Sequence, residues 1–154
     1  MPPLRIWWSA VGWWVWVPTT SEARPSTKWA KHIFSEVASA KMCFAHFVDG
    51  RASLVVGTHT HQPTADHQIL NGGTAYISDA GMCGDYDSSL GMDKEEPLNR
   101  FLSKVPKGRF EAAGGPATVC GVGVDVSDRT GLAERIAPLR LGPRLEETVP
   151  AFWR

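Results

Sequence analysis

Two histidines separated by one residue are the side chains in this sequence best suited to chemistry. His59 and His61 follow a short apolar run at residues 54–56 and a glycine at position 57. In an extended segment, side chains at positions i and i+2 point to the same side, so both rings are expected to reach into one pocket at the carboxyl end of a strand. Neutral imidazole is the commonest metal ligand and suits zinc, manganese and iron. The pattern therefore favours a metal site.

Two histidines do not complete a metal site. A catalytic zinc ion needs three protein ligands and one open position, so further ligands must come from elsewhere in the chain. A histidine pair of this spacing also occurs where no metal binds. The strand and the glycine before the pair are what favour the metal interpretation.

The remaining histidines and the carboxylates after residue 78 have simpler interpretations. His46 is expected to be a packed or surface residue, and His67 a solvated loop residue. A loop over residues 79–89 is rich in Gly, Asp and Ser. Because aspartate side chains bond to their own backbone in turns, turn formation is the expected role of its carboxylates, which are Asp79, Asp85 and Asp87.

The cysteines and the charge balance exclude several function classes. The 154 residues carry sixteen basic and sixteen acidic side chains, so no electrostatic footprint for a nucleic-acid duplex or an anionic membrane is present. The three cysteines form no paired motif; they suit a reducing cytoplasm, and each is expected to be a small buried hydrophobic residue. They are Cys43, Cys83 and Cys120.

Apolar periodicity and turn residues predict an α/β fold. A helix is expected over residues 27–49, closed by Asp49 and Gly50, with strands over 54–56 and 74–78. A short helix starts at Pro97, with Glu95 and Glu96 at its positive end. Strands are expected over 109–112, 117–126 and 132–141, the last two as an antiparallel hairpin. Glycines alternating with valines over 121–126 predict close packing against another layer.

The amino-terminal segment differs in character from the rest of the chain. Residues 6–17 are apolar and rich in tryptophan, but the run is too short to span a bilayer as a helix. A secretion signal is the alternative interpretation, although no clean cleavage site follows. We expect a non-homologous leader over residues 1–27, one domain over 28–148 and a tail over 149–154, with cytoplasmic location and no membrane association.

The motifs around the histidine pair resemble a known family. From about residue 39 to residue 148 the chain is similar to the carboxyl-terminal portion of the YmdB-type metallophosphoesterases, bacterial relatives of the calcineurin-like phosphoesterases. The family name here rests on long, specific motifs. They are Gly57-Thr58-His59-Thr60-His61, Pro63-Thr64-Ala65-Asp66, Gly72-Gly73-Thr74-Ala75-Tyr76-Ile77, Asp79-Ala80-Gly81-Met82, Gly84-Asp85-Tyr86-Asp87-Ser88 and Gly91-Met92-Asp93-Lys94.

The resemblance implies a metal-dependent phosphodiesterase that acts on cyclic nucleotides, including 2′,3′-cyclic ones. It implies part of a metallophosphatase-type layered sandwich, with a mixed sheet, flanking helices and the carboxyl-terminal hairpin. It also implies a binuclear centre of two divalent ions (iron, manganese or zinc), in which His59 and His61 match the family's paired histidine ligands. A phosphodiester is the implied partner, and a homo-oligomer is possible.

The sequence departs from the family pattern before the histidine pair. A further metal-binding histidine of the family falls on Phe34 here, and His32, two residues earlier, is only a weak substitute. The family's other ligands (Asp, Glu and Asn) and its catalytic histidine have no match, so no catalytic residue is expected in this chain. We expect a truncated member with weak or no activity. The alternatives are a non-catalytic remnant that binds metal weakly or serves as an interaction module, and an amidohydrolase, whose barrel needs about 250 residues.

Overall fold

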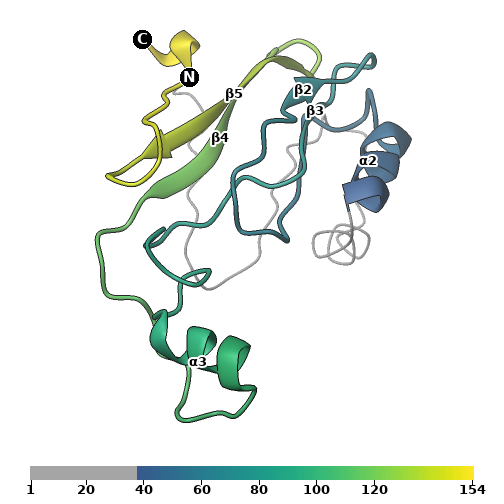
Figure 1. Cartoon of the computed structure of the whole chain (residues 1–154). Coiled ribbons are helices and arrows are strands. Elements are labelled where there is room, and N and C mark those ends of the chain that lie inside the picture. Colours follow the sequence, from purple (N-terminus) through teal and green to yellow (C-terminus); the bar gives the residue numbers. More distant parts are fainter. Residues whose placement is uncertain (1–37) are drawn as a thin grey trace.

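The computed structural model describes residues 38–154 and shows a mixed α/β arrangement of two sheets (Figure 1). The first sheet has the strand order β1-β3-β2, and the second is a two-stranded hairpin. The predicted fold class is confirmed. The strands are β1 (Leu54–Val56), β2 (Gln68–Ile69), β3 (Ala75–Ile77), β4 (Val119–Val126) and β5 (Ala133–Leu141), and the helices are α2 (Ala38–Phe47), α3 (Glu95–Ser103) and the short 3₁₀ helix η1 (Ala151–Trp153).

The first sheet is mixed, and β3 is its central strand. β1 pairs with β3 in parallel, with Val56 opposite Ile77. β2 pairs with β3 in the antiparallel sense. All three residues of β3 are buried, as expected of a central strand covered on both faces. The parallel pairing places the carboxyl ends of β1 and β3 at the same edge of the sheet.

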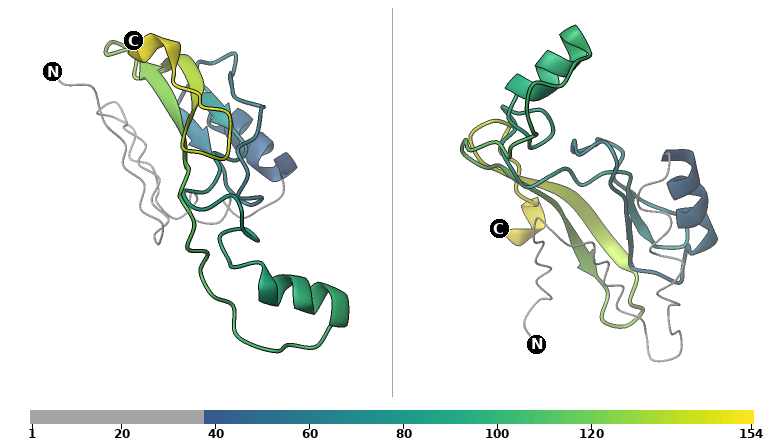
Figure 2. Two further views of the ribbon diagram at one scale, coloured as in Figure 1. Left: turned by 60° about the vertical axis from the view of Figure 1, so that its left-hand side comes forward. Right: turned by 90° about the horizontal axis from the view of Figure 1, so that it is seen from below.

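The two faces of this sheet pack against different elements (Figure 2). On one face, Val55 and Tyr76 form a buried cluster with Ala45 of α2. On the other, Val56 and Ile77 form a cluster against which Val122 of β4 packs. Alternate residues of each strand thus point to opposite layers. The sheet lies between α2 and the β4–β5 hairpin, which fixes the position of its loops.

The hairpin and the end of the chain confirm the predicted close packing. Val124 pairs with Ile136 in the antiparallel register. A Cβ atom on Gly123 would lie 2.6 Å from Pro150 Cγ and 2.8 Å from Trp153 Cζ2. Only a residue without a side chain therefore lets η1 approach β4 this closely.

The helix predicted over residues 27–49 is confirmed in the part that the structure describes. α2 ends at Phe47, and Gly50 has a φ of 77°, which a glycine adopts without steric cost. The Asp49 carboxylate accepts the backbone N–H groups of Gly72 at 2.7 Å and Thr74 at 3.1 Å. This aspartate therefore joins the end of α2 to the turn before β3.

The strand predicted over residues 109–112 is wrong. Ala112 forms only an isolated bridge with Met92, and the segment is otherwise irregular. The strand-like residues there lack a partner strand long enough to extend the pairing, and Phe110 stays 48% exposed. The helix predicted to start at Pro97 is present, but it begins two residues earlier. α3 starts at Glu95, which places Pro97 in its first turn, where proline is tolerated.

α3 projects from the rest of the molecule in every view (Figures 1 and 2). Its apolar residues stay exposed, with Leu98 at 55%, Phe101 at 80% and Leu102 at 71%. Among the described residues, no helix combines the length and the apolar character needed to cross a membrane.

Candidate functional site

The loop that carries the histidine pair is wrapped around a single carboxylate. The backbone N–H groups of His59, Thr60 and His61 all donate to Asp79 Oδ2, at 2.8, 2.7 and 3.0 Å. The hydroxyl of Thr60 adds a fourth hydrogen bond at 2.9 Å. Successive N–H groups that converge in this way form a concave site for an anion. Asp79 is 1% exposed, so the carboxylate that holds this loop is buried.

The predicted extended geometry of the histidine pair is therefore wrong, whereas its predicted location is confirmed. His61 has a φ of 60°, in the left-handed region, because three consecutive N–H groups can reach one oxygen only if the backbone curls. The loop still follows β1 directly, at the edge where β1 and β3 both end. His59 is exposed and His61 is half-buried. Their role as metal ligands remains a prediction.

Asp79 has a larger role than the predicted turn chemistry. Its Oδ1 does accept the N–H of Gly81 at 2.9 Å, as an aspartate in a turn would. Its Oδ2 holds the histidine loop, a role that sequence reasoning missed. The available signal was topological: Asp79 follows one strand and the histidine pair follows another, and parallel strands end at the same edge.

A buried lysine lies beside this loop and was also missed. Lys41 of α2 is 3% exposed, and its Nζ donates to the carbonyl oxygens of Thr58 at 3.2 Å and Ser78 at 3.1 Å. A Cβ atom on Gly57 would lie 2.2 Å from Ser78 O and 2.5 Å from Lys41 Cδ. Gly57 therefore leaves room for the lysine side chain to pass between the ends of β1 and β3.

A second carboxylate completes the polar network. Asp66 Oδ1 accepts the Thr64 hydroxyl at 2.6 Å and the N–H of Ser78 at 3.2 Å. Burial lowers the pKa of Lys41 from its ordinary value of 10.5, and the charges of Asp79 and Asp66 oppose that shift. Burial alone would raise the pKa of Asp66, but its hydrogen bonds outweigh burial and hold this pKa below 3.8.

The other predicted candidates do not join the histidine pair. His32 and Phe34 lie outside the described residues. His46 is exposed on α2. His67 is half-buried, and its Nδ1 is buried without a hydrogen-bond partner, so the prediction of a simply solvated histidine is wrong. Over residues 38–154, no group of three or more His, Cys, Asp or Glu side chains is placed to hold a metal ion.

The donor chemistry of the pair fits a partial metal site. Two imidazoles on an anchored loop suit the first-row metals, and as ligands they would be two of the three or more that a catalytic centre needs. The part of the chain that the structure describes does not complete such a centre.

The cysteines lie apart from this chemistry. Cys120 is buried, as expected, with its sulfur 3.1 Å from the Tyr86 hydroxyl. Cys83 is half-buried and donates to the carbonyl oxygen of Cys120 at 3.3 Å. Cys43 is exposed, so the prediction of a buried residue is wrong at that position. Burial raises the pKa of the Cys120 thiol, which keeps it in the unreactive protonated form.

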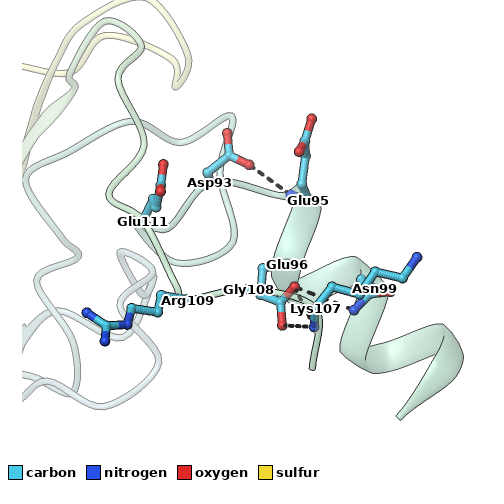
Figure 3. A pocket seen from close by; sticks show the side chains of 8 residues that line it. All are labelled: Asp93, Glu95, Glu96, Asn99, Lys107, Gly108, Arg109 and Glu111. Carbon is cyan, nitrogen blue, oxygen red and sulfur yellow. Dashed lines mark hydrogen bonds between the residues drawn. The ribbon is translucent and has the colours of Figure 1, made fainter. Parts of the chain in front are cut away.

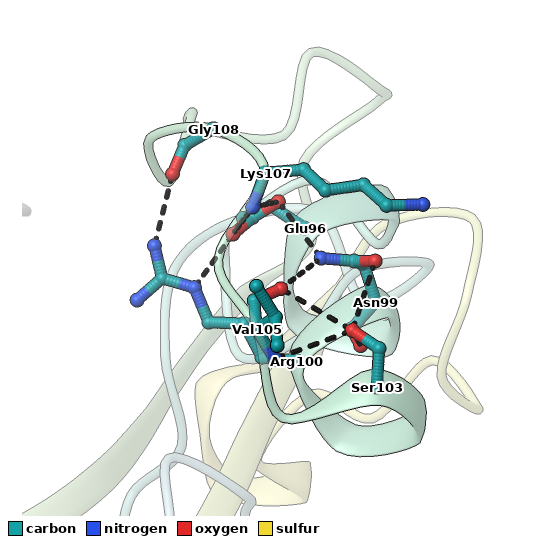
Figure 4. A network of polar contacts seen from close by, with 7 residues as sticks. All are labelled: Glu96, Asn99, Arg100, Ser103, Val105, Lys107 and Gly108. Carbon is teal, nitrogen blue, oxygen red and sulfur yellow. Dashed lines mark hydrogen bonds and ion pairs between the residues drawn. The ribbon is translucent and has the colours of Figure 1, made fainter.

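A polar pocket of about 440 Å³ lies at α3 (Figure 3), and no residue of the histidine loop lines it. Glu96, on its wall, accepts Arg100 Nε at 2.6 Å and the N–H of Lys107 at 3.1 Å. Arg100 also donates to the carbonyl of Gly108 at 2.9 Å (Figure 4). These bonds fold the 104–108 segment back onto α3. The lining residues are Asp93, Glu95, Glu96, Asn99, Lys107, Gly108, Arg109 and Glu111.

Comparison with known proteins gives consistent relatives. The chain is 50% identical over 102 residues to a 2′,3′-cyclic-nucleotide 2′-phosphodiesterase of Bacillus subtilis, a match that covers 66% of this chain and 38% of the relative. A solved structure of a hypothetical protein from Thermus thermophilus matches with a TM-score of 0.64 and 42% identity, over 70% of this chain and 41% of that one.

A solved structure described as a novel phosphatase from Mycoplasma pneumoniae also matches, with a TM-score of 0.64 and 33% identity, over 70% of this chain and 38% of that one. The chain thus spans well under half the length of these relatives. A family model described as YmdB-like protein matches residues 31–139. That match covers most of the chain, including the histidine loop, Lys41 and both carboxylates of the network. The chain therefore belongs to the YmdB-like family of metallophosphoesterases.

Proposed function

We propose that this chain contributes the histidine-bearing part of the metal centre of a phosphodiesterase that acts on 2′,3′-cyclic nucleotides. One observation carries the proposal. The pair His59 and His61 lies on a loop fixed by Asp79 at the carboxyl ends of two parallel strands. The chain is also 50% identical, over 102 residues, to a relative whose name states that activity.

His59 and His61 would be two of the ligands of a pair of divalent ions, which we propose to be iron, manganese or zinc. Such a pair, when bound, polarises phosphoryl oxygens and lowers the pKa of a bound water. The protein's own contribution is orientation. Because three backbone N–H groups of the loop and the Thr60 hydroxyl all bond to Asp79, little backbone freedom remains to be lost when a metal binds.

The chain on its own is proposed to be a weak hydrolase at most. Residues 38–154 bring no third ligand to the histidine pair, and the curated relative is spanned over only 38% of its length. The same observation favours a second function, in which the chain is a non-catalytic module that binds metal weakly through the pair.

Metal binding by matched histidine variants tests the assignment. Mn²⁺ or Zn²⁺ affinity is measured by calorimetry for the wild type, His59→Ala, His61→Ala and the control His46→Ala, in which an exposed histidine of α2 is removed. We expect weak binding that both loop variants lose and the control retains. Equal affinity in all four proteins would overturn the assignment of the pair.

Hydrolysis separates the two functions. Bis-p-nitrophenyl phosphate and a 2′,3′-cyclic nucleotide are offered to the same four proteins with Mn²⁺ or Fe²⁺. Slow turnover that disappears in His59→Ala supports the phosphodiesterase. Metal binding without any turnover supports the non-catalytic module, and robust turnover with two tightly held ions per chain would contradict a partial site.

A further inference from the structure

We propose that Lys41 is the positioning residue of the histidine loop. It acts with the buried Asp79 and the half-buried Asp66 as a brace of one positive and two negative charges. The inference rests on the proposed function only for the statement that the loop binds metal. The brace itself concerns what holds the loop in place.

The ammonium group of Lys41 lies between the histidine loop and the segment that carries Asp79. Its Nζ donates to the carbonyl of Thr58, which directly precedes His59, and to the carbonyl of Ser78, which directly precedes Asp79. One ammonium group therefore connects the residue before the loop with the residue before the carboxylate that anchors it. No other described side chain hydrogen-bonds to both of these segments from α2.

The apolar residues of α2 pack without this lysine. Ala45 is fully buried against Val55 and Tyr76, and Met42 and Phe44 pack against the same cluster. Burial of an ammonium group is costly unless charges and hydrogen bonds compensate it. An apolar side chain would serve packing equally well, so the lysine is explained by what its head group holds.

Gly57 and Thr64 accommodate the lysine and the two carboxylates. Gly57 leaves space for Lys41 Cδ, which a Cβ atom at that position would approach to 2.5 Å. Thr64 connects the Asp66 carboxylate with the backbone of Asp79, because its hydroxyl donates to Asp66 Oδ1 at 2.6 Å and accepts the backbone N–H of Asp79 at 3.1 Å. Asp66 and Asp79 are thus also linked to each other through Thr64.

Amide hydrogen exchange of the full chain tests the brace without requiring a metal. Lys41→Met keeps an unbranched apolar side chain, one atom shorter, and removes the ammonium group. Lys94→Met, at an exposed lysine, is the matched control. In Lys41→Met, we expect protection of the amides of residues 59–61 to fall about tenfold or more, since hydrogen bonds from charged donors are the stronger ones. Amides of the β4–β5 pairing should keep their protection. A uniform loss across both regions, or no loss at the loop, would overturn the proposal.

A second measurement covers the case in which Lys41→Met does not fold. In the wild type, the ¹⁵Nζ signal of Lys41 is expected to show slowed hydrogen exchange compared with Lys94, because its ammonium group donates to the buried carbonyl of Ser78 and the half-buried carbonyl of Thr58. A rapidly exchanging Lys41 ammonium would contradict the brace.

Mn²⁺ affinity separates this proposal from the proposed function. If the wild type binds Mn²⁺ and Lys41→Met binds it equally well with an unchanged loop, the brace is refuted and the metal site stands. If the wild type binds no metal while loop protection still depends on Lys41, the metal site is refuted and the brace stands.

Discussion

At the scale of single residues, the charge of Asp79 dominates the histidine loop. Its Oδ2 accepts four hydrogen bonds from the loop. In Asp79→Asn, either the amide NH₂ faces these donors or a neutral oxygen replaces a charged one. Donors left without a partner cost about 1–3 kcal/mol when buried. Because these donors are partly buried, we expect a loss of about 1–3 kcal/mol in the free energy of unfolding, measured with urea. The control Asp128→Asn, at an exposed turn residue, should change little, and equal losses in both variants would contradict the anchor.

The Asp66 carboxylate makes the free energy of unfolding depend on pH in the acid range. Its pKa in the folded state lies below 3.8, so the folded protein releases the proton more readily than the unfolded chain. The stabilisation is therefore fully present above about pH 4 and is lost as the pH falls through the folded pKa. Asp66→Asn should be less stable than the wild type at pH 7, and the difference should shrink towards pH 3. Urea unfolding at a series of pH values measures this, and a difference that stays constant with pH would argue against it.

Gly57 is required by the space between the strand ends. The Cβ atom of an alanine there would lie 2.2 Å from a backbone oxygen of Ser78, which cannot move without disturbing β3. Overpacking of this kind typically costs about 1–3 kcal/mol and sometimes more. Gly57→Ala should therefore lower the melting temperature clearly. Gly84→Ala is the matched control, because nothing lies within 4 Å of its added Cβ; a similar drop in both would refute the steric explanation.

Only part of the candidate site could be predicted from the sequence. The histidine pair could be placed at the end of a strand because its signal is local, a β-branched run followed by glycine. Asp79 and Lys41 could not be assigned, because their partners lie twenty and thirty-seven residues away in sequence. Their roles depend on the parallel pairing of β1 with β3 and on the packing of α2, and neither is visible in the neighbouring residues.

At the scale of elements, burial and not hydrophobicity decides which apolar residues stabilise the fold. Ile77 of β3 is 1% exposed, and Phe101 of α3 is 80% exposed. Ile77→Ala leaves a cavity in the centre of the sheet and should cost about 2–5 kcal/mol. Phe101→Ser should stay within about 0.5 kcal/mol of the wild type. Urea unfolding of the two variants checks this, and a large loss for Phe101→Ser would mean that α3 packs against something in solution.

Elements with local signals were predicted well, and those that depend on pairing were not. The β4–β5 hairpin was predicted because two alternating runs flank a turn rich in Ser, Asp and Gly. β2 has only two residues, too few for any periodicity, and exists because β3 offers it a partner. The strand predicted over 109–112 fails for the converse reason: its residues suit a strand, but the pairing with Met92 is limited to one bridge.

At the scale of the whole molecule, the fold described here is held together without any metal ligand. The histidine loop takes its shape from Asp79, the ends of β1 and β3 from Lys41, and the sheet from its two apolar clusters. This differs from small domains in which metal binding supplies the folding free energy. Removal of divalent ions should therefore leave the folded state intact.

Thermal unfolding with and without EDTA measures this independence. We expect the same melting temperature in both, since no described contact needs a metal. Added Mn²⁺ should then raise stability only by linkage, about 1.4 kcal/mol at ten times the dissociation constant. His61→Ala should abolish that increase and His46→Ala should retain it, because only the former removes a proposed ligand. Unfolding of the wild type by EDTA alone would show that a metal, and not the buried carboxylate, shapes the loop.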